Sequence, residues 1–146
     1  MKINAKFFNE LCTEELFEIY KLRTSVFVVE QKCPYQEVDD LDKVACHVFS
    51  TDDSGISAYL RILPKGSVSE YISIGRVIAR ERRKGLGTMI LNEGINTAID
   101  KFNADVIFIE AQSYAKEFYE KIGFVQVSEE FLLDNIPHIK MILKLK

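Results

Sequence analysis

The segment VIARERRKGLGT, residues 77–88, joins an apolar run to a long amphipathic one through a short basic turn with two glycines. After the turn, apolar residues recur with a period of about 3.6 residues, which predicts a helix. The members of this stripe are Leu86, Ile90, Leu91, Ile95, Ala98, Ile99 and Phe102. At such a strand–turn–helix junction, the first N–H groups of the helix lack an internal partner and the helix dipole is positive. The junction therefore predicts an anion site within a fold that contains both strands and helices.

The residues of the turn suit a phosphate group. Gly85 and Gly87 would let a pyrophosphate approach the backbone, and Arg82, Arg83 and Lys84 add positive charge around it. The turn is not a Walker A loop, because no Gly-Lys-Ser/Thr follows the glycines, and it lacks the third glycine of a Rossmann fingerprint. On spacing alone, a solvated basic helix start remains the alternative.

Periodicity elsewhere predicts a three-layer mixed α/β domain. Strands are expected at residues 2–8, 44–50, 56–63, 71–79 and 105–110, with a final pair at 124–128 and 138–145. Helices are expected after Thr13, which can act as an N-cap, at 86–102 and at 114–122, whereas 28–43 reads as irregular. Gly75 inside a strand indicates a bulge or the close approach of a ligand.

Composition excludes several classes of protein. The length of 146 residues, with 47% hydrophobic and 28% charged residues, fits one globular domain. The net charge of −3 gives no reason to expect a nucleic-acid partner. No apolar run could span a membrane, and the N-terminus does not resemble a signal peptide. The three cysteines lack CxxC spacing, which favours free thiols in a reducing cytoplasm. We therefore expect a cytoplasmic protein that has no membrane partner.

Two motifs carry a family resemblance. Arg82-x-x-Gly85-x-Gly87 resembles the Gln/Arg-x-x-Gly-x-Gly/Ala motif of the GCN5-related N-acetyltransferases, whose backbone amides hold the pyrophosphate of acetyl-CoA. The segment QSYAKEFYEKIGF, residues 112–124, resembles the family's later Asn-x-x-Ala-x-x-x-Tyr-x-x-x-Gly-Phe pattern, with Gln112 in place of Asn. The resemblance covers nearly the whole chain. It implies a single N-acetyltransferase domain over residues 1–146, with a mixed, mostly antiparallel central sheet flanked by helices.

Further segments narrow the resemblance to the ElaA-like branch of this family. They are RTSVFVVEQKCPY at residues 23–35 with the acidic residues that follow it, IGRV at 74–77, AQ at 111–112 and IPHIKM at 136–141. The Arg-x-x-Val-Phe and acidic pattern also resembles acyl-homoserine-lactone synthases, which share the fold but have longer chains.

The resemblance implies transfer of an acetyl group from acetyl-CoA to an amine by direct attack in a ternary complex, which releases CoA. Deprotonating an amine of pKa about 10.4 at pH 7 costs roughly 4.6 kcal/mol, so a general base is useful. Glu30, Glu37 and Glu110 are the candidates, although each could equally be a solvated surface group. A backbone N–H near Val77 or Ile78 would stabilise the thioester oxygen.

The expected site divides into three groups of residues. Tyr119 matches the family's general acid, so the catalytic candidates are Tyr119, Glu110 and Glu30. The expected cofactor-binding residues are Val77, Ile78, Arg82, Arg83, Lys84, Gly85, Leu86, Gly87, Thr88, Gln112, Ala115 and Tyr119. The expected acceptor-binding residues are Glu30, Tyr35, Glu37, Arg76 and His138.

Charge distribution suggests what kind of acceptor binds. Residues 30–42 hold five acidic residues and one lysine, whereas residues 76–84 hold five basic residues and one glutamate. One wall would then suit the polyanionic cofactor and the other a cationic amine. The acceptor is expected to be a small-molecule or protein amine, and a homodimer is left open.

Other chemistries remain as alternatives. Cys33 could act as a nucleophile with His47 or His138 as its base. No metal is expected, because the aspartates near residue 40 do not match a calcium loop, and Cys46 and His47 would face opposite ways in a strand. A catalytically idle acyl-CoA-binding module that regulates a partner is the alternative from another functional class.

Overall fold

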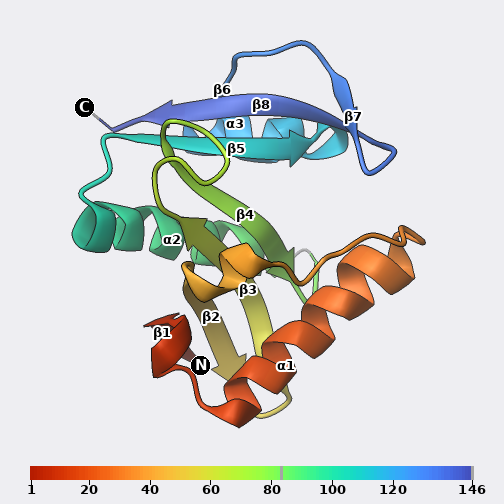
Figure 1. The fold of residues 1–146 in the computed structure, drawn as a ribbon, viewed down its shortest axis with the longest axis vertical. Coiled ribbons are helices and arrows are strands. Elements are labelled where there is room, and N and C mark those ends of the chain that lie inside the picture. Colours follow the sequence, from red (N-terminus) through yellow and green to blue (C-terminus); the bar gives the residue numbers. More distant parts are fainter. Residues whose placement is uncertain (83, 146) are drawn as a thin grey trace.

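The computed structural model describes residues 1–82 and 84–145, which form one mixed eight-stranded sheet with helices on both faces (Figure 1). The strands are β1 (Lys2–Phe7), β2 (Cys46–Asp52), β3 (Gly55–Leu63), β4 (Ile72–Ala79), β5 (Val106–Gln112), β6 (Val125–Gln126), β7 (Phe131–Leu133) and β8 (Ile136–Lys144). The helices are α1 (Thr13–Arg23), α2 (Leu86–Phe102) and α3 (Lys116–Ile122). A π-helix, Thr24–Glu30, continues α1, and short 3-10 turns lie at Phe8–Glu10, Asp40–Lys43 and Ser113–Ala115.

The strand order is β1-β2-β3-β4-β5-β8-β6, with β7 also paired to β8. The β4–β5 pair is parallel, and the other described pairs are antiparallel. The predicted mixed, mostly antiparallel sheet is therefore confirmed. The β2–β3 hairpin and helix α2 lie close to where periodicity predicts them.

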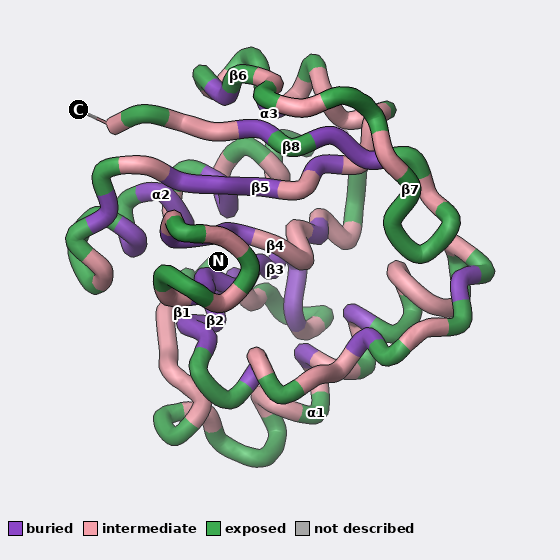
Figure 2. Tube along the Cα trace, turned by 45° about the horizontal axis from the view of Figure 1, so that its top comes forward, coloured by how far each residue is buried: buried purple, intermediate pink, exposed green. Residues whose placement is uncertain are grey.

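Alternation along the strands divides the core between the two faces of the sheet. In β3, Leu60 and Ile62 pack with α2 and α3, whereas Tyr59 packs on the other face with Ile19 of α1. Figure 2 shows the buried residues concentrated along the central strands, with the exposed ones in the loops and on the outer sides of the helices. The two clusters fix the position of α1 and α2 relative to β4.

Two local expectations near α1 are wrong. The N-cap of α1 is Cys12 rather than Thr13: its Sγ accepts the Glu15 N–H at 3.5 Å, and the Glu15 carboxylate accepts the Cys12 N–H at 2.9 Å. This reciprocal pair is a capping box that starts the helix one residue earlier. Residues 28–43 are not irregular throughout, because the π-helix reaches Glu30 and a 3-10 turn begins at Asp40.

The sheet opens between β4 and β5. Their pairing is limited to Ile72 with Ile107 and Ser73 with Phe108, although β4 continues to Ala79 and β5 to Gln112. Among the described residues, the edges that face each other beyond these pairs have no ladder partner. The diverging strands therefore leave backbone N–H and C=O groups free at the middle of the molecule.

Strand β4 contains a bulge, as the glycine at position 75 of the sequence predicts. Tyr59 pairs with Ile78 and Arg61 with Gly75, so Arg76 and Val77 together face the single residue between them on β3. The left-handed residue of the bulge is Arg76, with φ 55°, rather than Gly75. A non-glycine residue in this conformation costs about 1–2 kcal/mol, which neighbouring contacts must offset.

Candidate functional site

A cavity of about 720 Å³ occupies the opening between β4 and β5. The N-terminus of α2, helix α3, the segment around residues 26–35 and the β7–β8 turn complete its walls. The predicted site residues that line it are Glu30, Tyr35, Arg76, Val77, Ile78, Arg82, Gly85, Leu86, Gly87, Thr88, Glu110, Gln112, Ala115, Tyr119 and His138. Glu37 and Lys84 do not line it, and Arg83 lies outside the described residues.

The N-terminus of α2 offers an anion site at one end of the cavity. The first hydrogen bond of the helix runs from the Met89 N–H to the Gly85 carbonyl at 3.1 Å, so the N–H groups of Leu86, Gly87 and Thr88 precede it. Arg82 lines the same end, whereas the exposed Lys84 pairs with Glu81 at 3.3 Å. These free amides and the helix dipole suit a phosphate group.

The two glycines of the turn differ in backbone conformation and in surroundings. Gly85 is the N-cap of α2 and has φ 72°, a conformation that favours glycine. Gly87 has an ordinary conformation, but a Cβ there would lie 3.4 Å from Cζ of Phe118. The first glycine therefore shapes the turn, whereas a Cβ at the second would make an ordinary van der Waals contact with the Phe118 ring of α3.

Tyr119 lies at the base of the cavity with little exposed surface. Its ring lies between those of Phe118 and Phe124, with centroid distances of 5.0 and 5.7 Å. No group of the described residues hydrogen-bonds its hydroxyl. Burial raises the pKa of Tyr119 well above its usual value of 10, so the hydroxyl stays protonated at neutral pH. It can therefore donate a proton or a hydrogen bond into the cavity.

The cavity lining also includes candidate bases and hydrogen-bonding groups. Glu110 is half-buried on β5, whereas Glu30 is exposed at the end of the π-helix. Nδ1 of His138 lies 2.7 Å from the Ile136 carbonyl, which requires Nδ1 to carry the proton. In the neutral ring, Nε2 then keeps a free lone pair. The lining therefore offers two carboxylates and one imidazole as hydrogen-bond acceptors.

Gln112 makes a contact that its motif does not predict. Its side-chain amide forms two hydrogen bonds with the amide of Gln31, at 3.3 and 3.4 Å. Nearby, the thiol of Cys33 donates to the Asp134 carbonyl at 3.1 Å. These contacts join the segment that follows the π-helix to β5 and to the β7–β8 turn. Residues 31–33 therefore form part of the roof of the cavity.

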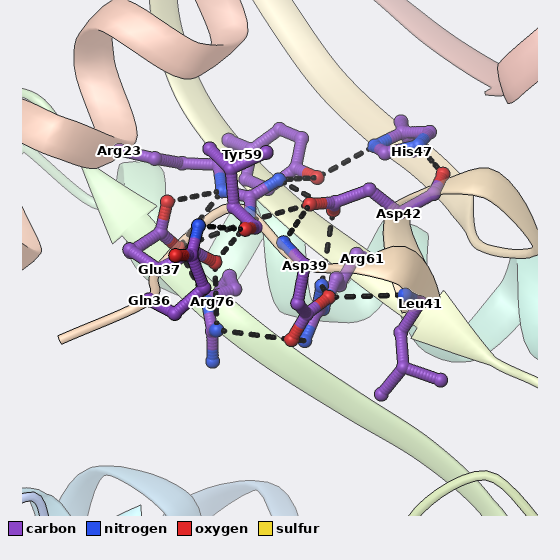
Figure 3. A network of polar contacts seen from close by, with 11 residues as sticks. Arg23, Gln36, Glu37, Asp39, Leu41, Asp42, His47, Tyr59, Arg61 and Arg76 are labelled. Carbon is purple, nitrogen blue, oxygen red and sulfur yellow. Dashed lines mark hydrogen bonds and ion pairs between the residues drawn. The ribbon is translucent and has the colours of Figure 1, made fainter.

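Glu37, one of the expected acceptor-binding residues, does not line the cavity. It is buried behind the cavity wall, where its carboxylate accepts hydrogen bonds from Arg23 and Arg76 (Figure 3). A carboxylate held between two guanidinium groups cannot act as a free general base. The structure therefore does not bring Glu37 into the cavity, and its role as an acceptor-binding residue or base stays a prediction.

The neighbouring aspartates belong to the same buried network (Figure 3). Asp42 pairs with Arg23 at 2.6 Å and with Arg61 at 3.0 Å, and Asp39 pairs with Arg61 at 2.8 Å. Burial raises the pKa of Asp42, but hydrogen bonds and charge from the two arginines outweigh it and leave the pKa below its usual value. Together with Glu37 and Arg76, three carboxylates balance three arginines. The expected acidic wall is largely neutralised inside the protein.

His47 extends this network and makes stability depend on pH. Its Nε2 donates to the Asp42 carbonyl at 2.9 Å, and its Nδ1 accepts from the Tyr59 hydroxyl at 2.6 Å. Burial lowers the pKa of His47 from its usual 6.5. As the pH falls through about 6.5, the unfolded chain binds a proton that the folded chain does not, so stability falls.

We therefore expect the free energy of unfolding to decrease from pH 7.5 to 5.5, with a His47 contribution of at most about 1.4 kcal/mol per pH unit. Urea unfolding at several pH values measures this slope. Titrating carboxylates contribute equally to the unaltered chain and to His47→Gln. The free energy of unfolding of this variant should therefore decrease less between pH 6.5 and 5.5. Identical profiles for the two proteins would contradict the assignment to His47.

Comparison with known proteins identifies the family to which this geometry corresponds. A family model described as "Acetyltransferase (GNAT) domain" matches residues 10–145. The chain belongs to the GNAT acetyltransferase family. The resemblance carried by the turn at residues 82–87 and by the later motif is therefore confirmed.

Relatives confirm the ElaA-like branch of the GNAT family. The UPF0039 protein C11D3.02c of Schizosaccharomyces pombe is 39% identical over 144 residues, which cover 96% of this chain and 95% of the relative. Protein ElaA of Escherichia coli is 35% identical over 137 residues, which cover 91% of this chain and 90% of the relative. The crystal structure of Escherichia coli ElaA matches with a TM-score of 0.91 over 98% of this chain and 99% of its own, at 31% identity.

Two further structures share the GNAT fold. An acyl-CoA N-acyltransferase from Pseudomonas aeruginosa matches with a TM-score of 0.91 and 37% identity, over 98% of this chain and 99% of its own. The acyl-homoserine lactone synthase BjaI, solved with SAM and isopentyl-CoA, matches with a TM-score of 0.81 over 99% of this chain and 83% of its own. At 16% identity, BjaI shows a common fold only.

Several residues that line this cavity are not among the predicted site residues, and Gln31, Tyr114, Phe118 and Asp134 are examples. Tyr114 and Phe118 lie inside the later motif at helical spacing, so that motif offers a signal for them. Gln31 lies inside the segment at residues 23–35 that resembles the ElaA-like branch, whereas Asp134 has no such signal.

Among the described residues, we also looked for a metal-binding cluster and for a membrane-spanning helix. Within residues 1–82 and 84–145, no group of three His, Cys, Asp or Glu side chains is arranged to hold a metal ion. No helix in that part of the GNAT domain is both long and apolar enough to cross a membrane.

Proposed function

We propose that this protein is an N-acyltransferase that moves an acetyl group from acetyl-CoA to an amine by direct attack in a ternary complex. The observation that carries the proposal is the meeting of two backbone features in one cavity. These are the free N-terminus of α2, which suits a pyrophosphate, and the open edge of β4, which suits an extended amide-containing arm.

The residues of the cavity take separate roles in this proposal. The N–H groups of residues 86–88 and Arg82 bind the pyrophosphate. A backbone N–H of Val77 or Ile78 stabilises the thioester oxygen as negative charge develops on it. Tyr119 protonates the departing thiolate, and Gln112, Ala115 and their neighbours line the path of the arm. Tyr35 and His138 contact the acceptor, and Arg76 lines the cavity beside them.

Glu110 is the general base in this proposal. It lies on a strand inside the cavity, whereas Glu30 is exposed at the rim and Glu37 is held in ion pairs. A base on a sheet strand is positioned more rigidly than one at the end of a π-helix. Glu110 accepts the amine proton directly or through a water molecule.

Replacing Glu110 by Gln is expected to lower kcat at pH 7 by at least about tenfold. The loss should shrink as the pH approaches the pKa of the acceptor, because the amine then loses its proton without help. Rates from pH 6.5 to 9.5 measure this dependence. If Glu30→Gln shows the effect and Glu110→Gln does not, the assignment to Glu110 is wrong.

Free-thiol release from acetyl-CoA against a library of amines tests the proposed function. The panel contains peptides with lysine or a free N-terminus, polyamines, amino sugars, drug-like amines and S-adenosylmethionine, and mass spectrometry identifies the product. Release of CoA together with an acetylated amine supports the proposal. Binding of acetyl-CoA without thiol release across the panel favours a regulatory acyl-CoA-binding module instead.

The same assay resolves two finer questions. Acyl-CoA donors of increasing chain length test the preference for acetyl groups. Acylation of S-adenosylmethionine alone would indicate a reaction like that of acyl-homoserine lactone synthases. We place the protein in the cytoplasm, because the free thiols of Cys12, Cys33 and Cys46 suit a reducing compartment.

A further inference from the structure

A series of contacts connects the end of α1 to the bulge of β4 (Figure 3). Arg23, the last residue of α1, donates from Nε to the two carboxylate oxygens of Glu37 at 3.1 and 3.0 Å. Its Nη2 donates to the Glu37 carbonyl at 3.1 Å. From the other side, Arg76 Nε donates to the same carboxylate, and Arg76 Nη2 donates to the Glu37 carbonyl at 2.9 Å. Glu37 therefore holds both arginines with its carboxylate and with its main-chain oxygen.

Arg76 is the point where these contacts reach the backbone of the site. It has the left-handed conformation that defines the bulge, and Val77 follows it directly. Its guanidinium lies 5.7 Å from the centre of the Tyr35 ring and 3.6 Å from the Asp39 carboxylate. The side chain of the strained residue is thus fixed by residues 35–39, with Glu37 making the shortest contacts.

Glu37 itself does not line the cavity, so any effect on the reaction must pass through Arg76. We propose that Glu37 is a positioning residue, which fixes the backbone of Arg76 and thereby the direction of the Val77 N–H. This inference rests on the proposed function, in which that N–H stabilises the thioester oxygen. The buried carboxylate of Glu37 then sets the geometry of the donor site.

Steady-state kinetics with acetyl-CoA and the best amine of the panel tests this proposal. Glu37→Gln keeps the shape of the side chain but removes its charge. Arg76→Asn tolerates the left-handed conformation but cannot reach Glu37. Each variant should lower kcat by at least about tenfold and leave KM for acetyl-CoA within about twofold, because the pyrophosphate site is unchanged. The double variant should be no slower than the slower single one, since both interrupt the same contact.

Asp52→Asn is the matched control. Asp52 pairs with Arg80 at 2.6 Å just beyond the end of β4, away from the bulge. The same loss of a carboxylate there should leave kcat unchanged. Thermal unfolding establishes that each variant is folded. A folded Glu37→Gln or Arg76→Asn protein with the kcat of the unaltered chain would overturn the proposal.

The backbone amide resonance of Val77 in an NMR titration with acetyl-CoA gives a readout that needs no turnover. The unaltered chain should show a shift at saturation that is reduced in Glu37→Gln and in Arg76→Asn. Equal shifts in all three proteins would overturn the role of Glu37 while leaving the proposed function intact. Reduced shifts without turnover for any amine would support the positioning role and contradict the proposed activity. No binding of acetyl-CoA by the unaltered chain would overturn both.

Discussion

Replacing Tyr119 by phenylalanine is expected to lower the acetylation rate at least about tenfold and to leave CoA affinity nearly unchanged. The ring is buried between Phe118 and Phe124, and its hydroxyl adds nothing to that packing. The variant therefore keeps the shape of the cavity and removes only the proton donor. Without it, the thiolate of CoA must leave unprotonated. Thiol-release kinetics and calorimetric titration with CoA measure the two quantities separately.

Tyr114→Phe is the matched control for Tyr119→Phe. Tyr114 lines the same cavity but is 77% exposed, so removing its hydroxyl changes the chemistry of the site far less. Its rate should stay close to that of the unaltered chain. An unchanged rate in Tyr119→Phe would remove Tyr119 from the mechanism. A loss of CoA affinity equal to the loss of rate would instead indicate a binding role.

Replacing Arg23 by methionine is expected to lower the free energy of unfolding by about 3–5 kcal/mol. Arg23 has no exposed surface and holds the carboxylates of both Glu37 and Asp42. Removing it leaves these charges buried with only part of their compensation, which costs more than the ion pairs contribute. Urea unfolding followed by circular dichroism measures the loss. At such a cost, much of the protein could be unfolded at 37 °C.

Lys21→Met is the control for this change because it removes a cation from the same turn of α1. Lys21 is largely exposed and pairs with Glu18 at 3.4 Å, so the variant should change stability by no more than about 0.5 kcal/mol. A loss below about 1 kcal/mol in Arg23→Met would show that the buried carboxylates find other partners or water.

The fold and the turn that opens α2 could be predicted because their signals are local. The periodic stripe from Leu86 to Phe102 and the Gly85 N-cap before it indicate where α2 begins without information from the rest of the chain. Gly75 indicates the bulge in β4 in the same way. Local rules could not show that Arg76 takes the left-handed conformation, since its side chain is held by residues almost forty positions earlier.

The environment of the acidic residues at 37–42 was harder to predict because charge in a sequence does not reveal pairing. Glu37, Asp39 and Asp42 read as an acidic surface, yet each meets an arginine from α1, β3 or β4. Arg23 falls on the apolar face of a predicted helix, where a charged residue needs a buried partner. An arginine at a core position and an acidic run that follows it together form a signal that could have suggested the network.

The opening between β4 and β5 has a consequence for how the protein is maintained in a cell. If an extended ligand pairs with the free edge of β4, that ligand serves as a temporary strand of the sheet. Folding and binding are then linked by mass action: a ligand at 100 times its Kd adds about 2.7 kcal/mol to the free energy of unfolding. The supply of thioester metabolites would then influence how much of the chain survives proteolysis, as well as how fast it works.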